Sequence, residues 1–313
     1  MQRETNRLKF EKVEACPLCA GTKLQHKFEV HHITGDPLHA WAPDQGYSLA
    51  PVVTCRDCDF MFKSLRPVAG YLEEHYAWLD ESYVERVAEE LPGFREDYDV
   101  ARRALLKAFP KGGSILDVGC ASGYFLESLG EKWGRHGLEI FHVAAQRATA
   151  RGGITIHECD VSSAGFGSES FDVVCSFDVV EHLAEPMSFF REARRVLKPG
   201  GWLLLGTGDA GSFGAQLSGS RWTYLCIPEH LSFFNPRSLR MALGEAGFSH
   251  LDCRRIHHGE RSRSARSGWL RGVGKHWAIT LCGEKITRLR LFRQKTTTFL
   301  IPYFFDHMIC IAY

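Results

Sequence analysis

The pattern of hydrophobic and polar positions divides the 313-residue chain into segments of different character. Between residues 111 and 256, short apolar runs alternate with stretches that carry apolar residues at three- and four-residue spacing. The short runs predict buried strands, and the spaced positions predict amphipathic helices. Such alternation is typical of a parallel sheet with helices on both faces. The predicted strands are residues 114–118, 136–139, 155–158, 171–176, 202–207 and 250–256.

The flanks of this core follow other patterns. Residues 1–66 are rich in Cys, His and Pro without a helical period, whereas residues 67–110 show helical spacing in "YLEEHYAWL" and "DYDVARRALLKAF". A basic stretch covers residues 257–304, and the closing "HMICIAY" predicts a last strand within 305–313. We therefore expect a small N-terminal domain, a helical linker or cap, a core over 111–256, a basic insertion and a final strand of the core.

The composition bounds the class of protein. Hydrophobic residues make up 44% of the chain and charged residues 24%, as in soluble globular proteins with a core. The N-terminal "MQRETNRLKFEKVEA" does not resemble a secretory signal, and no apolar stretch is long enough to span a bilayer. Of eleven cysteines, four form close pairs, and the other seven are scattered like buried thiols in a reducing compartment. These features predict a cytoplasmic protein.

A cluster of small residues interrupts the stretch "ILDVGCASGYFLESL" at 115–129. The apolar run before it predicts a strand end, and the residues after it predict a helix. A tight turn of small residues lets a ligand lie against the backbone at a helix N-terminus, so the turn indicates a nucleotide-type site. A nicotinamide site would show three glycines spaced Gly-x-Gly-x-x-Gly. Here the run is Asp117, Gly119, Ala121 and Gly123.

This run resembles the first motif of class I S-adenosylmethionine-dependent methyltransferases, with Ala121 in place of the usual middle glycine. The segments "GLEI", "HECDV", "FDVVCSFDVVEHLAEP" and "REARRVLKPGGWLLLGT" resemble later parts of the family in the same order. The resemblance covers residues 111 to about 248. It implies an α/β, Rossmann-like fold with a seven-stranded mixed sheet whose last strand is antiparallel. It also implies S-adenosylmethionine as the cofactor.

The resemblance also implies a set of cofactor-binding residues. Glu139, at the end of the second strand, would accept hydrogen bonds from both ribose hydroxyls. Asp160, after the third strand, would face the adenine amino group. Asp117 would fix the turn close to the cofactor, and a purely structural role in the turn is the alternative. The full set that we expect is Asp117, Gly119, Ala121, Gly123, Tyr124, Glu139, Asp160 and Phe177.

Two cysteine pairs, "CPLC" and "CRDC", have the two-residue spacing that lets both thiolates reach one tetrahedral ion. Cys16, Cys19, Cys55 and Cys58 therefore predict a structural Zn²⁺ site in the N-terminal domain. A redox dithiol and four unrelated cysteines stay open as alternatives. A closed site leaves no open position for substrate on the ion, so we expect it to support folding, with framing of the substrate as a further role, and we do not expect catalysis at the zinc. A histidine of the linking stretch is a further alternative ligand, from His26, His31, His32 and His39.

A later segment, "RWTYLCIPEHLSFF", resembles methyltransferases that carry an N-terminal zinc module and act on sugars or natural products. In the sugar C-methyltransferases among them a Glu-His pair lies at the acceptor, and the histidine is the base. This implies catalytic roles for Glu229 and His230, and histidine suits general-base work because its pKa lies near operating pH. The alternative is that His230 packs against Phe233 and Phe234. His182 is the second candidate base.

Net charge is +1, but residues 254–295 carry twelve Lys or Arg against two acids, which leaves −9 on the rest of the chain. A basic segment on an acidic protein indicates an anionic partner. A helix in "EKITRLRLFRQK" would be amphipathic and could lie on an anionic membrane surface or pack on the sheet. No nucleic-acid-binding module is recognised, so nucleic acid is not expected. The sequence does not indicate an oligomeric state.

Together these features predict a methyltransferase with a small-molecule acceptor, a sugar or a glycosylated intermediate. A lipid-linked or polyanionic acceptor held by the basic segment stays open. So does a zinc-bearing binding protein without turnover, and a nicotinamide dehydrogenase is a more distant alternative. The sequence does not identify the acceptor atom as oxygen, nitrogen or carbon.

Overall fold

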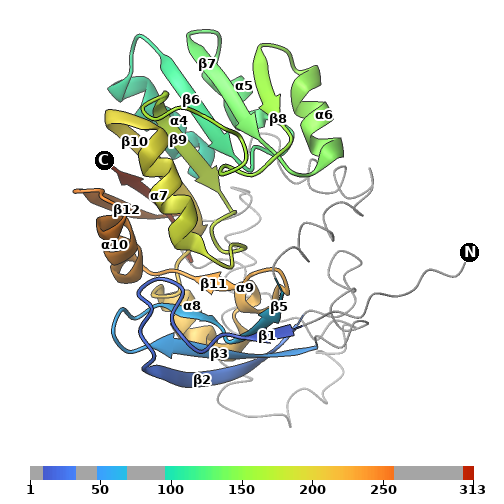
Figure 1. Cartoon of the computed structure of the whole chain (residues 1–313), viewed down its shortest axis with the longest axis vertical. Coiled ribbons are helices and arrows are strands. Elements are labelled where there is room, and N and C mark those ends of the chain that lie inside the picture. The colour runs from blue at the N-terminus through green and yellow to red at the C-terminus, as the bar shows by residue number, and fades with distance from the viewer. Residues whose placement is uncertain (1–9, 33–47, 69–95, 257–305) are drawn as a thin grey trace, which may run out of the picture.

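The computed structural model describes residues 10–32, 48–68, 96–256 and 306–313. A seven-stranded sheet with helices forms the upper part of the molecule in Figure 1, and a four-stranded sheet forms the lower part. The helical pattern predicted in "YLEEHYAWL" and the basic insertion at 257–304 lie outside the described residues. Within the part that the structure describes, no helix is long and apolar enough to cross a membrane.

The seven-stranded sheet confirms the predicted fold class. Its order is β12-β13-β10-β9-β6-β7-β8. Strands β6 to β10 run parallel, and β13 is antiparallel to both β10 and β12. The strands are β6 (Gly113–Val118), β7 (Trp133–Leu138), β8 (Ile154–His157), β9 (Phe171–Phe177), β10 (Leu197–Gly208), β12 (Leu251–Ile256) and β13 (His307–Ala312).

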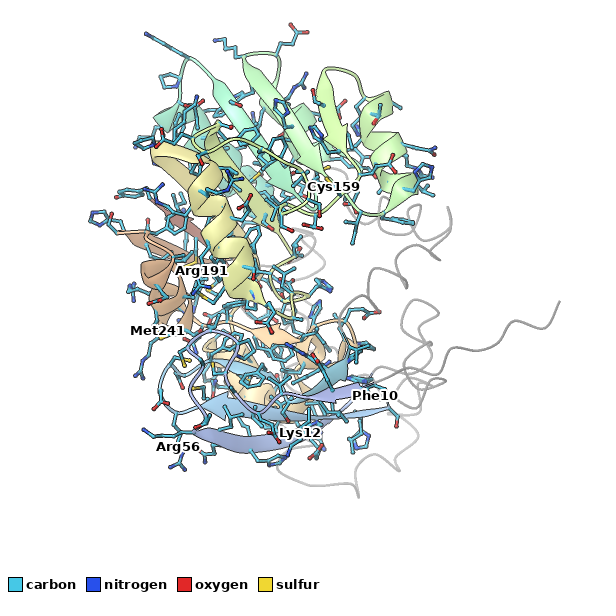
Figure 2. All side chains as sticks on the ribbon, in the orientation of Figure 1. Phe10, Lys12, Arg56, Cys159, Arg191 and Met241 are labelled. Carbon is cyan, nitrogen blue, oxygen red and sulfur yellow. A yellow bond between two sulfur atoms is a disulfide. The ribbon has the colours of Figure 1, made fainter. Side chains whose placement is uncertain are left out.

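Alternation along β10 explains why helices cover both faces of this sheet. Leu203 and Leu205 point to one face and join the core cluster that contains residues of α7 and α10, whereas Leu204 joins the cluster on the opposite face. Arg191 on α7 and Met241 on α10 mark two helices of one layer in Figure 2. The helices are α4 (Glu96–Ala108), α5 (Tyr124–Leu129), α6 (His142–Ala150), α7 (Pro186–Val196) and α10 (Pro236–Glu245).

The four-stranded sheet combines N-terminal residues with a strand from beyond β10. Its order is β11-β4-β3-β2, and β1 pairs separately with β5. Three short helical segments precede β11. Tyr224 and Leu225 of α9, with Trp222 just before it, pack in one cluster with Val52 of β3. The elements are β1 (Phe10–Lys12), β2 (Leu24–His31), β3 (Leu49–Cys55), β4 (Met61–Lys63), β5 (Leu65–Pro67), α8 (Phe213–Ser218), η1 (Gly219–Arg221), α9 (Thr223–Cys226) and β11 (Ser232–Phe233). The predicted domain boundaries remain predictions, but this packing joins residues on both sides of residue 66.

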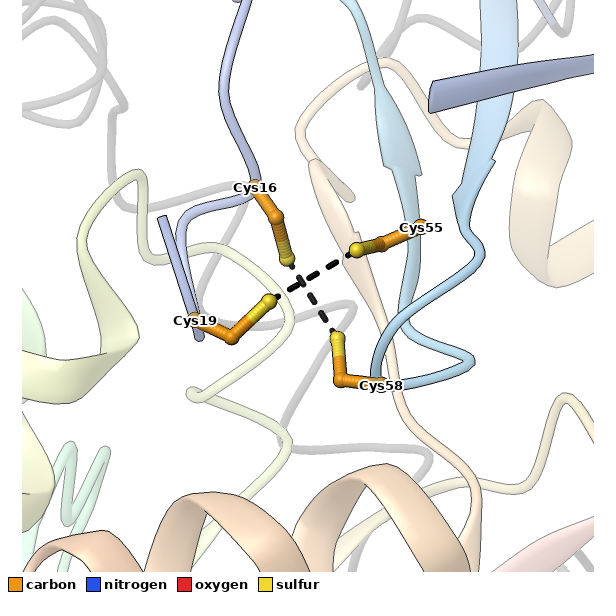
Figure 3. A group of neighbouring side chains, drawn as sticks. All are labelled: Cys16, Cys19, Cys55 and Cys58. Atoms are coloured by element: carbon orange, nitrogen blue, oxygen red, sulfur yellow. Dashed lines mark hydrogen bonds between the residues drawn. The ribbon is translucent and has the colours of Figure 1, made fainter. Parts of the chain in front are cut away.

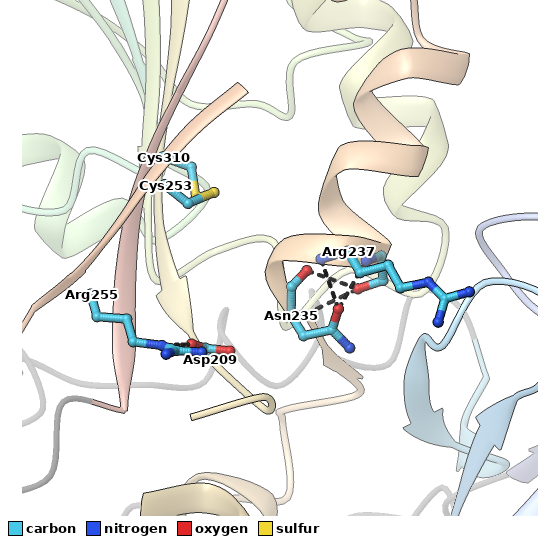
Figure 4. The surroundings of a disulfide bond; sticks show 7 residues. Asp209, Asn235, Arg237, Cys253, Arg255 and Cys310 are labelled. Carbon is cyan, nitrogen blue, oxygen red and sulfur yellow. Dashed lines mark hydrogen bonds and ion pairs between the residues drawn. A yellow bond between two sulfur atoms is a disulfide. The ribbon is translucent and has the colours of Figure 1, made fainter. Parts of the chain in front are cut away.

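One expectation about the cysteines is wrong. Cys253 on β12 and Cys310 on β13 form a disulfide, so the seven scattered cysteines are not all free thiols. The two lie directly opposite each other on adjacent antiparallel strands, as Figure 4 shows, although 57 residues separate them in sequence. Sequence spacing could not reveal this pairing, because it follows from the register of β12 and β13.

The N-terminus of α10 gives a test of the fold. The Asn235 side chain accepts hydrogen bonds from the backbone N–H groups of Arg237 and Ser238, both at 2.9 Å (Figure 4). The Ser238 hydroxyl oxygen in turn accepts one from the Asn235 N–H at 3.1 Å. Asn235→Ala should lower the free energy of unfolding by about 1 kcal/mol, whereas Asn235→Asp, which keeps the accepting oxygen, should lower it less. Urea denaturation measures both variants. Equal stability of wild type and Asn235→Ala would contradict this account of the helix start.

Candidate active site

The glycine turn between β6 and α5 is built for close approach. Gly119 and Gly123 have φ angles of 76° and 75°, in the left-handed region that favours glycine. A Cβ atom on Gly119 would lie 2.4 Å from Cγ2 of Val179, so only glycine fits there. Ala121 also has a positive φ of 46°. The turn lies at the carboxyl end of β6, where open α/β sheets bind their ligands.

Glu139 braces this turn from the end of β7. Its Oε2 accepts a hydrogen bond from the Ala121 N–H at 2.8 Å, and its Oε1 accepts one from the Phe141 N–H at 2.9 Å. Burial raises the pKa of Glu139, although these backbone donors act in the opposite direction. Each carboxylate oxygen accepts more than one hydrogen bond, so the side chain keeps capacity for the predicted ribose hydroxyls. The sequence did not reveal the bracing role.

The other predicted cofactor residues have structural partners of their own. Asp117 is buried in β6, where it pairs in register with Cys175 of β9. The Arg151 guanidinium lies 3.5 Å from the centre of the Tyr124 ring. The Phe177 ring packs against Phe125, with 4.8 Å between the ring centres. None of these contacts tests binding of the cofactor.

Asp160 lies just beyond β8 and is exposed, and its carboxylate is used by its own loop. Oδ1 accepts hydrogen bonds from the N–H and hydroxyl of Ser162 and from the Ser163 N–H, and Oδ2 accepts one from the Ser163 hydroxyl. Burial acts to raise the pKa of Asp160, but these hydrogen bonds outweigh it and hold the pKa below its usual range. The contact with adenine remains a prediction.

A buried polar cluster, absent from the predicted site, lies beyond the carboxyl ends of β9 and β10. The fully buried Glu181 accepts hydrogen bonds from the Tyr224 hydroxyl at 2.5 Å and from the Thr207 hydroxyl at 2.9 Å. Burial, with the neighbouring Asp178, raises the pKa of Glu181 to about 7. Glu181 stands beside His182 in the motif that carried the resemblance, but its burial appears only in the folded chain.

His230 joins this cluster through its ring. The imidazole is 6% exposed, and its Nδ1 lies 2.9 Å from the Tyr224 carbonyl oxygen. Because a carbonyl only accepts, Nδ1 carries the proton and Nε2 is the basic nitrogen. The ring packs at 4.1 Å from the Tyr224 ring and 4.7 Å from the His182 ring, measured between centres. Burial, followed by His182 and Lys63, lowers the pKa of His230 well below its ordinary value.

These contacts bring both predicted bases together. One donor atom from each of Glu181, His182 and His230 lies within 4.8 Å of the other two. Glu229, the predicted partner of His230, is 4% exposed and raises the pKa of the buried Lys63. A buried carboxylate beside two imidazoles can hold and move a proton.

The four predicted zinc ligands converge near the N-terminus of the chain, as Figure 3 shows. The Sγ atoms of Cys16 and Cys58 are 3.5 Å apart, and those of Cys19 and Cys55 are 3.6 Å apart. Zinc with four sulfurs at about 2.3 Å separates them by roughly 3.8 Å, so the donor set fits. The Cys16 sulfur and burial raise the pKa of Cys58, so four thiolates form here only with a cation to balance them.

Two histidines of the linking stretch have other partners. His26 Nε2 lies 3.1 Å from the Glu29 carboxylate, and His32 Nε2 lies 3.0 Å from Lys63 Nζ. His39 lies outside the described residues. The group of neighbouring donor atoms that the structure describes here consists of the four cysteines.

Comparison with known proteins places the chain in a family. The ubiquinone biosynthesis O-methyltransferase of Cereibacter sphaeroides (strain ATCC 17029) is 28% identical over 158 residues, which cover 45% of this chain and 62% of that protein. The protein of the same name from Leptothrix cholodnii is 26% identical over 173 residues, covering 51% and 72%. The chain thus spans about 62% of the length of the first of these curated relatives.

Solved structures of similar proteins include an S-adenosylmethionine-dependent methyltransferase from Mesorhizobium loti, with a TM-score of 0.45 and 18% identity over 69% of this chain and 98% of that one. Another is a possible histamine N-methyltransferase from Thermotoga maritima, with a TM-score of 0.46 and 17% identity over 77% and 95%. The family model described as "Methyltransferase domain" matches residues 88–252. Because that match covers more than half of this chain, the chain belongs to the methyltransferase domain family.

Proposed function

We propose that the protein catalyses methyl transfer from S-adenosylmethionine to a small molecule, with His230 as the general base. The observation that carries the proposal is the buried imidazole of His230, whose Nδ1 lies 2.9 Å from the Tyr224 carbonyl oxygen, so that Nε2 can accept a proton. The segment after β9 connects this base to the cofactor turn. Val179 lies against Gly119, and His182, whose N–H donates to the Val179 carbonyl, packs against His230.

The chemistry that these residues would perform is alignment and proton removal. The donor methyl group and the acceptor atom must lie in line, which is where a positioned site gains most of its rate. The bound cofactor would supply the activated methyl group. The glycine turn and Glu139 would hold its ribose end, and His230 Nε2 takes the proton that the acceptor hydroxyl loses. The neighbouring Asp178 carboxylate favours the positive charge that His230 gains.

For the acceptor we propose a hydroxyl group on a sugar or a glycosylated intermediate. The Glu229–His230 pair and the four-cysteine cluster support the sugar class through their resemblance to zinc-bearing sugar methyltransferases. Relatives that are O-methyltransferases by name support transfer to oxygen. Contact of the basic segment with an anionic membrane or acceptor also remains a proposal. Within it, Arg255 pairs with Asp209 at 2.6 Å.

A variant of Glu139 tests the cofactor site. Glu139→Ala should weaken S-adenosylmethionine binding by roughly 10- to 150-fold, because the ribose loses a charged acceptor worth about 1.5–3 kcal/mol. Glu158→Ala is the matched control, since Glu158 follows the next strand and pairs with His142 on the surface. Isothermal calorimetry measures both. Unchanged affinity in a folded Glu139→Ala protein would remove Glu139 from the site.

We also propose that the four-cysteine cluster binds a structural zinc ion. Elemental analysis should find about one zinc per chain, and Cys58→Ser should lose the metal and lower the melting temperature. Cys226→Ser changes a free cysteine outside the cluster, so this variant should keep the zinc content and the melting temperature of the wild type. A folded, reduced wild-type sample without zinc would contradict the proposal.

The two histidines test the chemistry. Labelled S-adenosylmethionine is incubated with nucleotide-linked sugars and, separately, with catechols as phenolic probes. His230→Gln should lower kcat by about 10²- to 10⁴-fold with cofactor affinity kept within about twofold, since a general base contributes that much. His182→Gln should cost less. Normal turnover by His230→Gln, together with an inactive His182→Gln, would show that His182 is the base. Transfer of the labelled methyl group to catechols but not to sugars would reject the sugar class.

A further inference from the structure

Lys63 is a lysine of the N-terminal sheet whose side chain has no exposed surface. Its ammonium has three N–H donors, and three acceptors surround it. Nζ lies 2.7 Å from the Ile227 carbonyl oxygen, 3.3 Å from that of Pro228 and 3.0 Å from His32 Nε2. A buried ammonium is costly unless it is hydrogen-bonded in this way. The Lys63 side chain therefore binds the main chain just before Glu229 and His230.

The main chain of Lys63 holds the other end of the same segment. The Lys63 N–H donates to the Leu231 carbonyl at 2.9 Å. The strand pairing of β4 with β11 continues from there, with Phe62 opposite Ser232. The catalytic pair thus lies between two points, residues 227–228 and Leu231, that one residue of the N-terminal domain holds.

Charge adds a second effect to this geometry. Burial lowers the pKa of Lys63 to about 7, although the neighbouring Glu229 and Cys226 act in the opposite direction. Below that pH the ammonium is charged, and its charge disfavours a proton on His230. The titratable groups that face this pair are His32, His182, Tyr224, Cys226, Glu229, Asp178 and Glu181.

We propose that Lys63 is a positioning residue for methyl transfer: through it, the N-terminal domain fixes the segment 227–231, sets the His230 ring in place and keeps that ring in its basic form. The inference rests on the proposed role of His230. It also gives the four-cysteine domain a part in catalysis through the position of the base. The domain supplies the residue that holds the base.

The first test needs no turnover. The His230 ring is titrated by NMR in the wild type, in Lys63→Met and in Lys23→Met, a control in the same domain whose exposed ammonium pairs with Asp57. Removal of a nearby positive charge favours the protonated imidazole, so Lys63→Met should move the His230 titration to higher pH. Lys23→Met should leave it in place. An unmoved titration in Lys63→Met with zinc and cofactor bound would overturn the proposal.

The second test measures kcat against pH with whichever acceptor of the sugar and catechol panel the wild type methylates. Lys63→Met should lower kcat by about 10²-fold, as misplacement of a catalytic group by 1 Å does, and should shift the acidic limb to higher pH. Lys63→Arg, which keeps the charge, should leave the limb in place. A loss of kcat with an unmoved limb in Lys63→Met would show a merely structural role.

A further variant is needed in case Lys63→Met does not fold. If Lys63→Met loses zinc, Lys63→Gln replaces it, because its amide still donates to the Ile227 carbonyl without a charge, and the same shift to higher pH is expected. Absence of methyl transfer by the wild type would reject the proposed function alone, while the NMR titration would still decide the role of Lys63.

Discussion

The main-chain carbonyl of Glu181 accepts hydrogen bonds from the N–H groups of Leu231 at 2.8 Å and Ser232 at 2.9 Å, and the geometry of the site depends on this link. On one side the chain continues back through Val179, which lies against Gly119 of the glycine turn. On the other side it fixes the strand that follows His230. A single short segment after β9 therefore connects the glycine turn with the proposed base.

Buried polar groups surround this link, and each is stable only because its partners are buried with it. Lys63 is surrounded by two carbonyls and an imidazole, and Glu181 accepts hydrogen bonds from two hydroxyls. Removal of one partner would leave a buried charge or donor unmatched, at a cost of several kcal/mol.

Asp178 and Ala121 also adopt positive φ angles, of 54° and 46°. Such strain clusters at functional sites, where the surrounding structure enforces it.

Much of the fold could be predicted from the sequence because its signals are local. Strand period, helix spacing and the small residues from Gly119 to Gly123 depend on neighbours in the chain, and so does the spacing of each cysteine pair. The resemblance then predicted the antiparallel last strand. Glu139 was correctly placed at a strand end, but its bond to Ala121 was not foreseen.

What the sequence did not predict depends on distant residues. Lys63 contacts the carbonyl of Ile227, which is 164 positions away, and Glu181 bonds to Tyr224 across 43 positions. The disulfide between Cys253 and Cys310 follows from strand register. Lysine and glutamate are ordinarily surface residues, so only the folded chain shows that these two are buried.

A crystal structure with S-adenosylhomocysteine bound would test the central claim most directly, because it shows the cofactor and His230 together. The account predicts the ribose hydroxyls within about 2.6–3.2 Å of the Glu139 carboxylate. It also predicts that the sulfur faces an open space reached by His230 Nε2. A ribose bound away from Glu139, or a His230 Nε2 separated from the sulfur by protein atoms, would contradict the account.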